Sequence, residues 1–181
     1  FAPSSAEGFL FPDTYEFVEG MSEEEVVAAF FRQFHRVWEE VSAQGFSSDR
    51  LSPIDRVVLA SMVESEAKVA KEREIISSIF LNRLKRGYPL QSCATVQYAL
   101  GERKSRLLYK DLEYESPYNT YKYYGLPPGP ISNPGRASLE AALRPAKTDF
   151  LYFVARPDGS HIFSRSYREH LNAQRGVNAN N

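Results

Sequence analysis

The chain has 181 residues, 43% of them hydrophobic, and a formal net charge of -1 at pH 7. This length and apolar content suit one domain with a substantial core. Lys and Arg are scattered along the chain, which excludes the basic footprint needed to bind nucleic acid or anionic membranes. The single Cys93 excludes an internal disulfide. The 3 His residues are too dispersed for a sequence-local metal motif, so we expect neither a metal nor a cofactor.

The N-terminal part, residues 1–45, is expected to hold an extended segment followed by a helix. Residues 7–17 are aromatic and interrupted by proline, which indicates a packed segment that is extended or looped. Ser22 and Glu25 have the spacing of a capping box, and an apolar stripe at helical spacing continues from them to about Gly45. The pattern predicts a helix whose aromatic residues are buried.

Two more helices are expected after a polar link. One begins near Pro53, because proline is tolerated in the first turn of a helix. The other covers residues 72–86 and ends at Gly87, a residue suited to the position just past a helix. The sequence leaves open whether this helix continues the preceding one or follows a break near Lys71.

The stretch from residue 88 to residue 135 shows no pattern of regular structure. Residues 114–130 within it are crowded with Tyr, Pro and Gly, which predicts an ordered, irregular loop. Loops of this length inside a compact domain are usually functional, so we expect this one to line a cleft.

The C-terminal part is expected to end in a hairpin. A short helix over residues 138–143 comes first. Residues 149–155 and 161–164 then flank Pro157-Asp158-Gly159, which is a strong hairpin signal. The polar residues 172–181 are expected to form a frayed tail.

Together these elements predict an α+β fold: a helical region, a long Tyr/Pro/Gly-rich loop and a small antiparallel sheet with a C-terminal hairpin. We expect a single domain over residues 1–171, with its core in residues 53–171.

Glu66 is an acid on an otherwise apolar helical stripe. The positions that share its helix face are all apolar: Leu59, Met62, Val63, Val69 and Ala70. Glu64 points the other way, where Lys68 at i+4 would give an ordinary solvated ion pair. Desolvation favours the protonated form of a carboxyl group, and a protonated acid near neutral pH can act as a general acid. Glu66 is therefore a candidate proton donor.

A structural role for Glu66 stays open on this pattern. A buried acid is often paired with an arginine, and Arg73 would lie on the same face if the helix continued that far. Perturbed acids cluster at active sites, but structural ion pairs perturb them too.

The Tyr- and Asn-rich loop suggests carbohydrate binding, because sugar rings pack on aromatic side chains and their hydroxyls need amide and phenol partners. A purely structural loop remains the alternative. Ordinary glycoside hydrolases need a second carboxylate. Glu64 is not that partner on a regular helix. The other acids in the later loops stand in no recognisable pairing: Glu102, Asp111, Glu113 and Glu115.

A series of short motifs runs in order from Glu7 to about His170. They are Glu7-Gly8-Phe9-Leu10-Phe11-Pro12-Asp13-Thr14-Tyr15, Ala60-Ser61-Met62-Val63-Glu64-Ser65-Glu66, Phe80-Leu81-Asn82-Arg83-Leu84, Leu90-Gln91, Tyr118-Asn119-Thr120-Tyr121, Gly125-Leu126-Pro127-Pro128-Gly129-Pro130-Ile131, Asn133-Pro134-Gly135 and Tyr152-Phe153-Val154. Each motif alone is weak, but the ordered set is specific. In this set the chain resembles the MltG (YceG-like) endolytic murein lytic transglycosylases.

This resemblance implies a bacterial enzyme that cuts peptidoglycan glycan strands between N-acetylmuramic acid and N-acetylglucosamine and leaves a 1,6-anhydro end. One glutamate suffices for this chemistry. It donates its proton to the glycosidic oxygen and then acts as a base toward the muramyl C6 hydroxyl, which attacks the anomeric carbon. The family's catalytic acid is the second Glu of a Glu-x-Glu motif, which corresponds to Glu66.

The resemblance also implies supporting residues. Asn82, Gln91, Tyr118, Asn119 and Tyr121 match family positions, and we assign them to the substrate cleft or to the hydrogen-bonding shell of Glu66. A structural role for each of them stays open.

One departure from the family pattern is visible. The family commonly continues Leu-Gln-x with Asp-Pro-Thr-Val, whereas this chain reads Cys93-Ala94-Thr95-Val96 after Ser92. No role for that acid is expected here. A lone cysteine without a nearby histidine is expected to be a small buried residue and not a nucleophile.

The resemblance implies a parent protein with an N-terminal membrane helix and a small LysM-like region before a catalytic part outside the cytoplasmic membrane. Neither is present in this chain, so we expect a soluble catalytic fragment. The implied partners are peptidoglycan glycan strands and cell-wall synthesis enzymes, without nucleic acid. Two alternatives remain: a water-using muramidase of the same fold, and a non-catalytic glycan-binding or scaffold module in which Glu66 is structural.

Overall fold

The computed structural model describes residues 5–47, 50–102, 104 and 107–179. Its elements in chain order are α1 (Glu23–Ser42), α2 (Pro53–Glu66), the 3-10 turn η1 (Ala70–Glu72), α3 (Arg73–Lys85), α4 (Cys93–Leu100), α5 (Tyr109–Leu112), α6 (Arg136–Leu143), β1 (Tyr152–Ala155), β2 (His161–Ser164) and α7 (Tyr167–Ala179). The described part of the chain thus combines helices with one two-stranded antiparallel sheet. The predicted α+β fold is confirmed.

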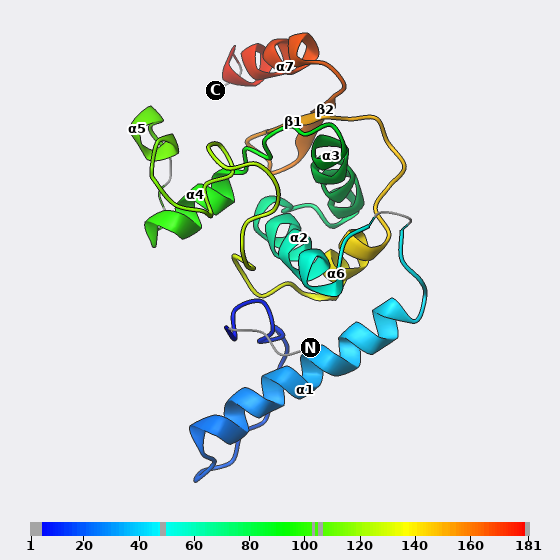
Figure 1. Cartoon of the computed structure of the whole chain (residues 1–181), viewed down its shortest axis with the longest axis vertical. Helices are drawn as coiled ribbons and strands as arrows, with labels where there is room; N and C mark the ends of the chain where they lie inside the picture. The colour runs from blue at the N-terminus through cyan, green and yellow to red at the C-terminus, as the bar shows by residue number, and fades with distance from the viewer. Residues whose placement is uncertain (1–4, 48–49, 103, 105–106, 180–181) are drawn as a thin grey trace.

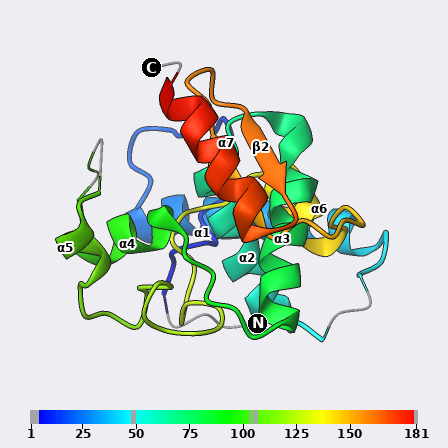
Figure 2. The same ribbon diagram turned by 90° about the horizontal axis from the view of Figure 1, so that it is seen from above.

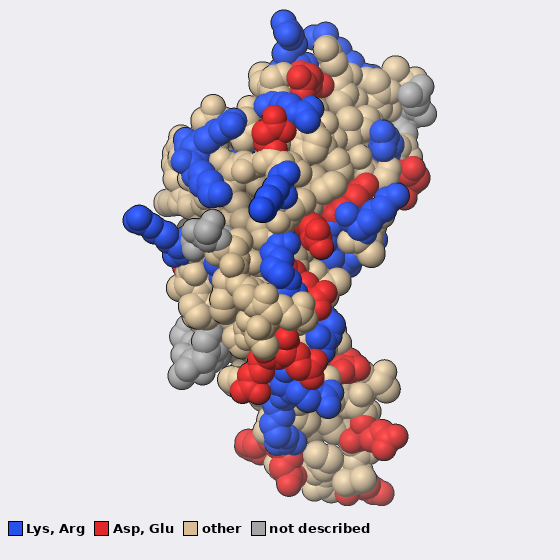
Figure 3. Space-filling model, turned by 90° about the vertical axis from the view of Figure 1, so that its right-hand side faces the viewer, with Lys and Arg blue, Asp and Glu red and all other residues tan. Residues whose placement is uncertain are grey.

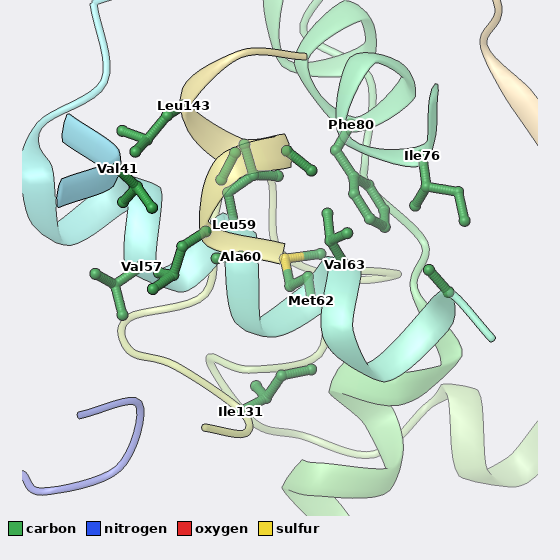
Figure 4. Close-up of a cluster of buried hydrophobic side chains, with 14 of the residues drawn as sticks. Val41, Val57, Leu59, Ala60, Met62, Val63, Ile76, Phe80, Ile131 and Leu143 are labelled. Atoms are coloured by element: carbon green, nitrogen blue, oxygen red, sulfur yellow. The ribbon is translucent and has the colours of Figure 1, made fainter. Parts of the chain in front are cut away.

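Helix α2 is the centre of the molecule. It packs between α3 and α6 and also contacts α4 (Figure 1). Every residue from Arg56 to Val63 is buried, so α2 is enclosed on all sides and has no solvated face over that stretch. Figure 4 shows Leu59, Met62 and Val63 of α2 among side chains from α3 and α6, such as Phe80. Burial of these side chains is the main force that fixes the end of α2 in space.

The starts of α1 and α2 follow local sequence signals. Ser22 and Glu25 form the predicted capping box of α1. Ser52 and Asp55 form a second capping box before Pro53, which occupies the first turn of α2. The first turn of α1 is acidic, and acidic side chains gather at the lower end of the face in Figure 3. The helix dipole favours negative charge at the amino end of α1.

The helical stripe predicted to run on to Ala70 is wrong beyond Glu66, and of the two alternatives for the next helix the structure has the break near Lys71. Glu66 is the last residue of α2, and Ala67 is already extended, with φ -85° and ψ 106°. The apolar stripe therefore does not run on through Val69. A buried Glu72 in η1 contacts His161 on β2, with 2.7 Å between the carboxylate and Nδ1. This contact ties the break between α2 and α3 to the hairpin.

Two helices interrupt the stretch for which no regular structure was predicted. They are α4, which ends at Gly101 in the left-handed conformation with φ 71°, and the single turn α5. The predicted irregular loop at 114–130 is confirmed, because neither helix nor strand occurs within it. In the chain this loop lies between α5 and α6.

The C-terminal part closes the side of the core next to α3. β1 and β2 pair antiparallel, with Tyr152 opposite Ser164 and Ala155 opposite His161, as the hairpin signal predicted. Helix α7 contacts both strands and lies along the outer side of the hairpin (Figures 1 and 2). The predicted frayed tail is wrong for residues 172–179, which belong to α7, and residues 180–181 lie outside the described part.

Candidate active site

Glu66 lies where the carboxyl end of α2 meets the amino end of α4. Its side chain is half-buried and faces a cleft of about 490 Å³. The cleft is lined by Ser65, Glu66, Cys93, Ala94, Gln97, Tyr98, Gly101, Glu102 and Ile131. The expectation of an apolar environment is wrong, because the carboxylate contacts polar groups on one side and the open cleft on the other.

The carboxylate of Glu66 accepts two hydrogen bonds from the start of α4. The Ser92 hydroxyl donates to Oε1 at 2.5 Å, and the Ala94 amide donates to the same oxygen at 3.4 Å. Ser92 is the N-cap residue of α4, yet its hydroxyl makes no capping bond to its own helix. The Glu66 carboxylate takes the place of the missing cap, because the Ala94 amide in the first turn of α4 donates to Glu66 instead of to the Ser92 hydroxyl.

Glu66 has no cationic partner in the part of the chain that the structure describes. Among the described residues no lysine or arginine forms an ion pair with Glu66. The group is therefore held in place by hydrogen bonds from the start of α4 and not by an ion pair.

The loop after α5 fixes the turn that carries Ser92. The Ser92 amide donates to Thr120 Oγ1 at 3.0 Å, and the Thr120 and Thr95 hydroxyls share a bond of 2.9 Å. The Gln91 amide donates to the Thr120 carbonyl at 3.0 Å. Sequence reasoning missed Ser92, Thr95 and Thr120. The available signal was a serine directly before a short apolar helical run, which is typical of an N-cap.

Tyr121 and Cys93 meet beside Glu66. The Tyr121 hydroxyl and the Cys93 sulfur are 3.2 Å apart. Burial raises the pKa of the Tyr121 phenol far above its ordinary value, and the neighbouring Cys93 and Glu66 add to the effect. The pKa of the Cys93 thiol is also raised, chiefly because its sulfur atom is shielded from solvent. As a residue, however, Cys93 is exposed and lines the cleft, so the expectation that it is buried is wrong.

Gln91 lies directly before this turn, and its side chain is held by Arg83. The Arg83 guanidinium donates to Gln91 Oε1 at 2.5 Å and to the carbonyls of Pro89 and Leu151. Burial lowers the pKa of Arg83, while nearby tyrosines, Tyr152 first, raise it. Gln91 adopts φ 50°, a left-handed conformation that is uncommon outside glycine. Arg83 thus stabilises a strained residue next to Ser92.

Tyr118 contributes to the cleft through a neighbour. Its ring packs on that of Tyr98, a cleft residue, with ring centroids 4.8 Å apart. The Tyr118 hydroxyl lies 2.8 Å from where a Cβ on Gly129 would be, so a side chain there would have to displace the Tyr118 hydroxyl. The loop and α4 are therefore packed together through aromatic rings.

The structure does not bring Asn82 and Asn119 into hydrogen-bonding contact with Glu66, so neither belongs to its hydrogen-bonding shell, and their assignment to the substrate cleft stays a prediction. The Asn82 amide donates to the carbonyls of Thr148 and Phe150, in a separate pocket. Asn119 is 0% exposed, donates to the carbonyls of Leu112 and Tyr114, and accepts from the Tyr121 amide. Both amides fix loop backbone.

Glu64 does not form the predicted ion pair with Lys68. Its Oε2 accepts hydrogen bonds from the Ser138 hydroxyl at 2.7 Å and the Gly135 amide at 3.1 Å. Its Oε1 lies 3.8 Å from Arg73 Nη2. Arg73 is thus the partner of Glu64, and the alternative that paired Arg73 with Glu66 is wrong.

Within the described ranges, no group of three or more His, Cys, Asp and Glu side chains is placed to hold a metal ion. No helix in the same ranges has the length and apolar character of a membrane span.

The fold and the cleft define an α+β domain with one carboxyl group presented at the junction of two helices. The model of the YceG-like family matches residues 2–176, and the chain belongs to that family. The crystal structure of a YceG-like protein from Listeria monocytogenes is similar, with a TM-score of 0.82 and 42% sequence identity. The match covers 92% of this chain and 55% of that chain.

Two relatives carry the name endolytic murein transglycosylase. The protein of Bacillus subtilis (strain 168) is 45% identical over 169 residues, which cover 93% of this chain and 47% of the relative. The protein of Streptococcus pneumoniae serotype 2 is 31% identical over 185 residues, covering 93% of this chain and 33% of the relative. The chain thus spans half or less of the length of these relatives.

Proposed function

We propose that this chain is the catalytic region of an endolytic peptidoglycan lytic transglycosylase. It cleaves the bond between N-acetylmuramic acid and N-acetylglucosamine and forms a 1,6-anhydro end, with Glu66 as the catalytic residue. One observation carries the proposal: Glu66 is held at one oxygen by Ser92, has no cationic partner among the described residues, and faces a cleft. The names of the relatives support the same reaction.

Glu66 serves first as an acid and then as a base. The protonated carboxyl gives its proton to the glycosidic oxygen as that bond to the anomeric carbon breaks. The resulting carboxylate takes the proton of the muramyl C6 hydroxyl, whose oxygen then bonds to the anomeric carbon. Glu66 ends protonated again, and no water is consumed.

The cleft offers contacts for a sugar ring. Tyr98 presents an aromatic ring and Gln97 an amide, the two kinds of group that carbohydrates need. We assign Gln91, Tyr118 and Tyr121 to the support of this cleft. We further propose that the chain acts outside the cytoplasmic membrane in cell-wall assembly, as part of a membrane-anchored parent that associates with cell-wall synthesis enzymes.

The test is digestion of purified peptidoglycan in water enriched in heavy oxygen, followed by mass spectrometry of the new glycan ends. We expect anhydro ends without heavy oxygen, because the C6 oxygen of the substrate is the nucleophile. Reducing ends that carry heavy oxygen would reject the transglycosylase reaction in favour of a muramidase. Intact glycan strands would favour a non-catalytic binding module.

One observation gives the muramidase alternative its own test. Glu102 is a second carboxylate on the cleft, 62% exposed and 3.1 Å from Lys104. A two-carboxylate hydrolase would need it as a base or nucleophile. We expect Glu102→Gln to change the cleavage rate less than about threefold, since a single acid completes our reaction. A rate as low as that of Glu66→Gln would support hydrolysis instead.

A further inference from the structure

We propose that Ser92 is the positioning residue of Glu66. Its hydroxyl holds Oε1, so that Oε2 is the oxygen that gives and takes the proton. This inference rests on the proposed function, because it assigns a role within that reaction. It concerns a residue that the sequence motifs did not single out.

The two carboxylate oxygens of Glu66 are not equivalent. Oε1 accepts from the Ser92 hydroxyl at 2.5 Å and from the Ala94 amide at 3.4 Å. Among the described residues no hydrogen bond reaches Oε2. A proton on Oε1 would point at the hydrogens of those two donors, whereas a proton on Oε2 meets no such conflict. With Ser92 and Ala94 donating to Oε1, we assign the acidic proton of Glu66 to Oε2.

The Ser92 side chain is fixed in place by its surroundings. Ser92 is 1% exposed, so water does not compete for its hydroxyl. Its amide donates to Thr120, and its carbonyl accepts from the Thr95 hydroxyl at 2.7 Å. With both backbone groups held, only rotation of one side-chain bond remains. The hydroxyl also gives up the capping bond that an N-cap serine normally makes. Its single described interaction is the one with Glu66.

This arrangement explains how one carboxyl serves both steps. In the first step the Oε2–H bond breaks as the glycosidic oxygen gains the proton. In the second, Oε2 takes the proton of the C6 hydroxyl. Ser92 donates to Oε1 throughout, so the side chain keeps its orientation between the steps and no rotation is needed. The bond also stabilises the carboxylate more than the acid.

The chain offers a matched control in Ser138. Its hydroxyl donates to Glu64 at 2.7 Å, beside the amino end of α6 and away from the cleft residues. Ser92→Ala and Ser138→Ala therefore each remove a serine hydroxyl that donates to a glutamate of α2, and the Ser138 hydroxyl in addition accepts from Arg73 Nε at 3.1 Å. Only the first contact involves the catalytic acid. A purely structural role for Ser92 predicts that the two variants behave alike.

The experiment measures the pH dependence of kcat and KM for glycan cleavage by the whole chain and by both variants. We expect Ser92→Ala to lower kcat by about 10- to 100-fold with little change in KM. The alkaline limb of its rate profile should move to higher pH, because a carboxylate that loses a donor holds its proton more tightly. Ser138→Ala should leave kcat and the profile unchanged. Ser92→Thr, which keeps the hydroxyl, should restore most of kcat.

A second measurement does not depend on catalysis. NMR titration of isotope-labelled glutamate carboxyls, with the Glu66 signal identified by its loss in Glu66→Gln, should show a higher titration midpoint in Ser92→Ala. If that variant does not fold, Ser92→Cys keeps the packing but is only a weak donor, and the same shift is expected.

Two results would overturn the inference. One is a folded Ser92→Ala or Ser92→Cys with the rate profile and titration of the unmodified chain. The other is an equal shift in Ser138→Ala. If the unmodified chain cut no glycan, the proposed function would fail, and the titration alone would still decide whether Ser92 controls the proton of Glu66.

Discussion

Glu64 and Glu66 lie two residues apart at the end of α2 and have nearly the same hydrogen-bond partners, but we assign them different roles. Glu64 accepts from the Ser138 hydroxyl and the Gly135 amide at the amino end of α6. Glu66 accepts from the Ser92 hydroxyl and an amide at the amino end of α4. Each glutamate therefore joins α2 to the start of another helix through one serine and one backbone group.

The difference lies on the opposite side of each carboxylate. Arg73 lies 3.8 Å from Glu64, and the side chains are 17% and 32% exposed. Glu66 faces the cleft instead, without a cation among the described residues. A nearby cation stabilises the ionised form and makes a poor acid. The two glutamates therefore differ in whether a cation lies beside the carboxylate. Glu64 has one and is a structural residue, whereas Glu66 has none among the described residues and is the candidate proton donor.

The largest effect that keeps the acid chemistry should come from Glu66→Asp. The shorter side chain draws the carboxyl away from Ser92 and from the cleft. Displacing a catalytic group by about 1 Å lowers the reaction rate by about 100-fold. We expect that loss in initial rates of glycan release, with an unchanged urea midpoint. If Glu66→Asp cut glycan at the rate of the unmodified chain, the exact placement of the carboxyl group would not matter for catalysis.

On the other carboxylate, Arg73→Met should affect stability and not chemistry. It removes the ion pair with Glu64 and the hydrogen bond to Ser138. We expect unfolding free energy to fall by about 1–2 kcal/mol in urea titrations. The rate per folded molecule should stay the same. A loss of rate without a loss of stability would assign Arg73 to the cleft and remove the contrast between the two glutamates.

The smallest expected effect is on the pH dependence of the rate at which a reagent modifies the Cys93 thiol. Because its thiol pKa is raised, the fraction of reactive thiolate at a given pH is lower than in free cysteine. We expect a thiol reagent to modify Cys93 more slowly than free cysteine at pH 8 and to reach its half-maximal rate at higher pH. Faster modification than free cysteine would indicate an activated thiol beside Glu66.

Local signals in the sequence predicted much of the fold. The capping box at Ser22, Pro53 in the first turn of α2, the left-handed Gly87 and the turn at Pro157-Asp158-Gly159 are each determined by a few neighbouring residues, so they form without long-range contacts. The end of α2 is different. No glycine or proline marks it, and the segment that follows is held by contacts with residues far away in the sequence, such as that between Glu72 and His161.

The candidate site could be predicted only in part. Glu66 emerged from an apolar stripe, yet α2 is buried on all sides over Arg56–Val63, so the stripe does not distinguish it physically. Its assignment stays a prediction that now rests on Ser92 and the cleft. Asn82 and Asn119 matched motif positions but bond to backbone, because a motif records which residues are needed and not whether they serve folding or substrate.

The most direct test compares Glu66→Gln with Glu64→Gln, each measured for glycan cleavage and for thermal unfolding. We expect Glu66→Gln to lose about 10²- to 10⁴-fold in rate with an almost unchanged midpoint, since its amide oxygen still accepts from Ser92. Glu64→Gln should lose stability, by about 1–2 kcal/mol, and keep its rate per folded molecule. The account would be contradicted if Glu66→Gln still cut glycan at the unmodified rate, or if Glu64→Gln alone abolished cleavage.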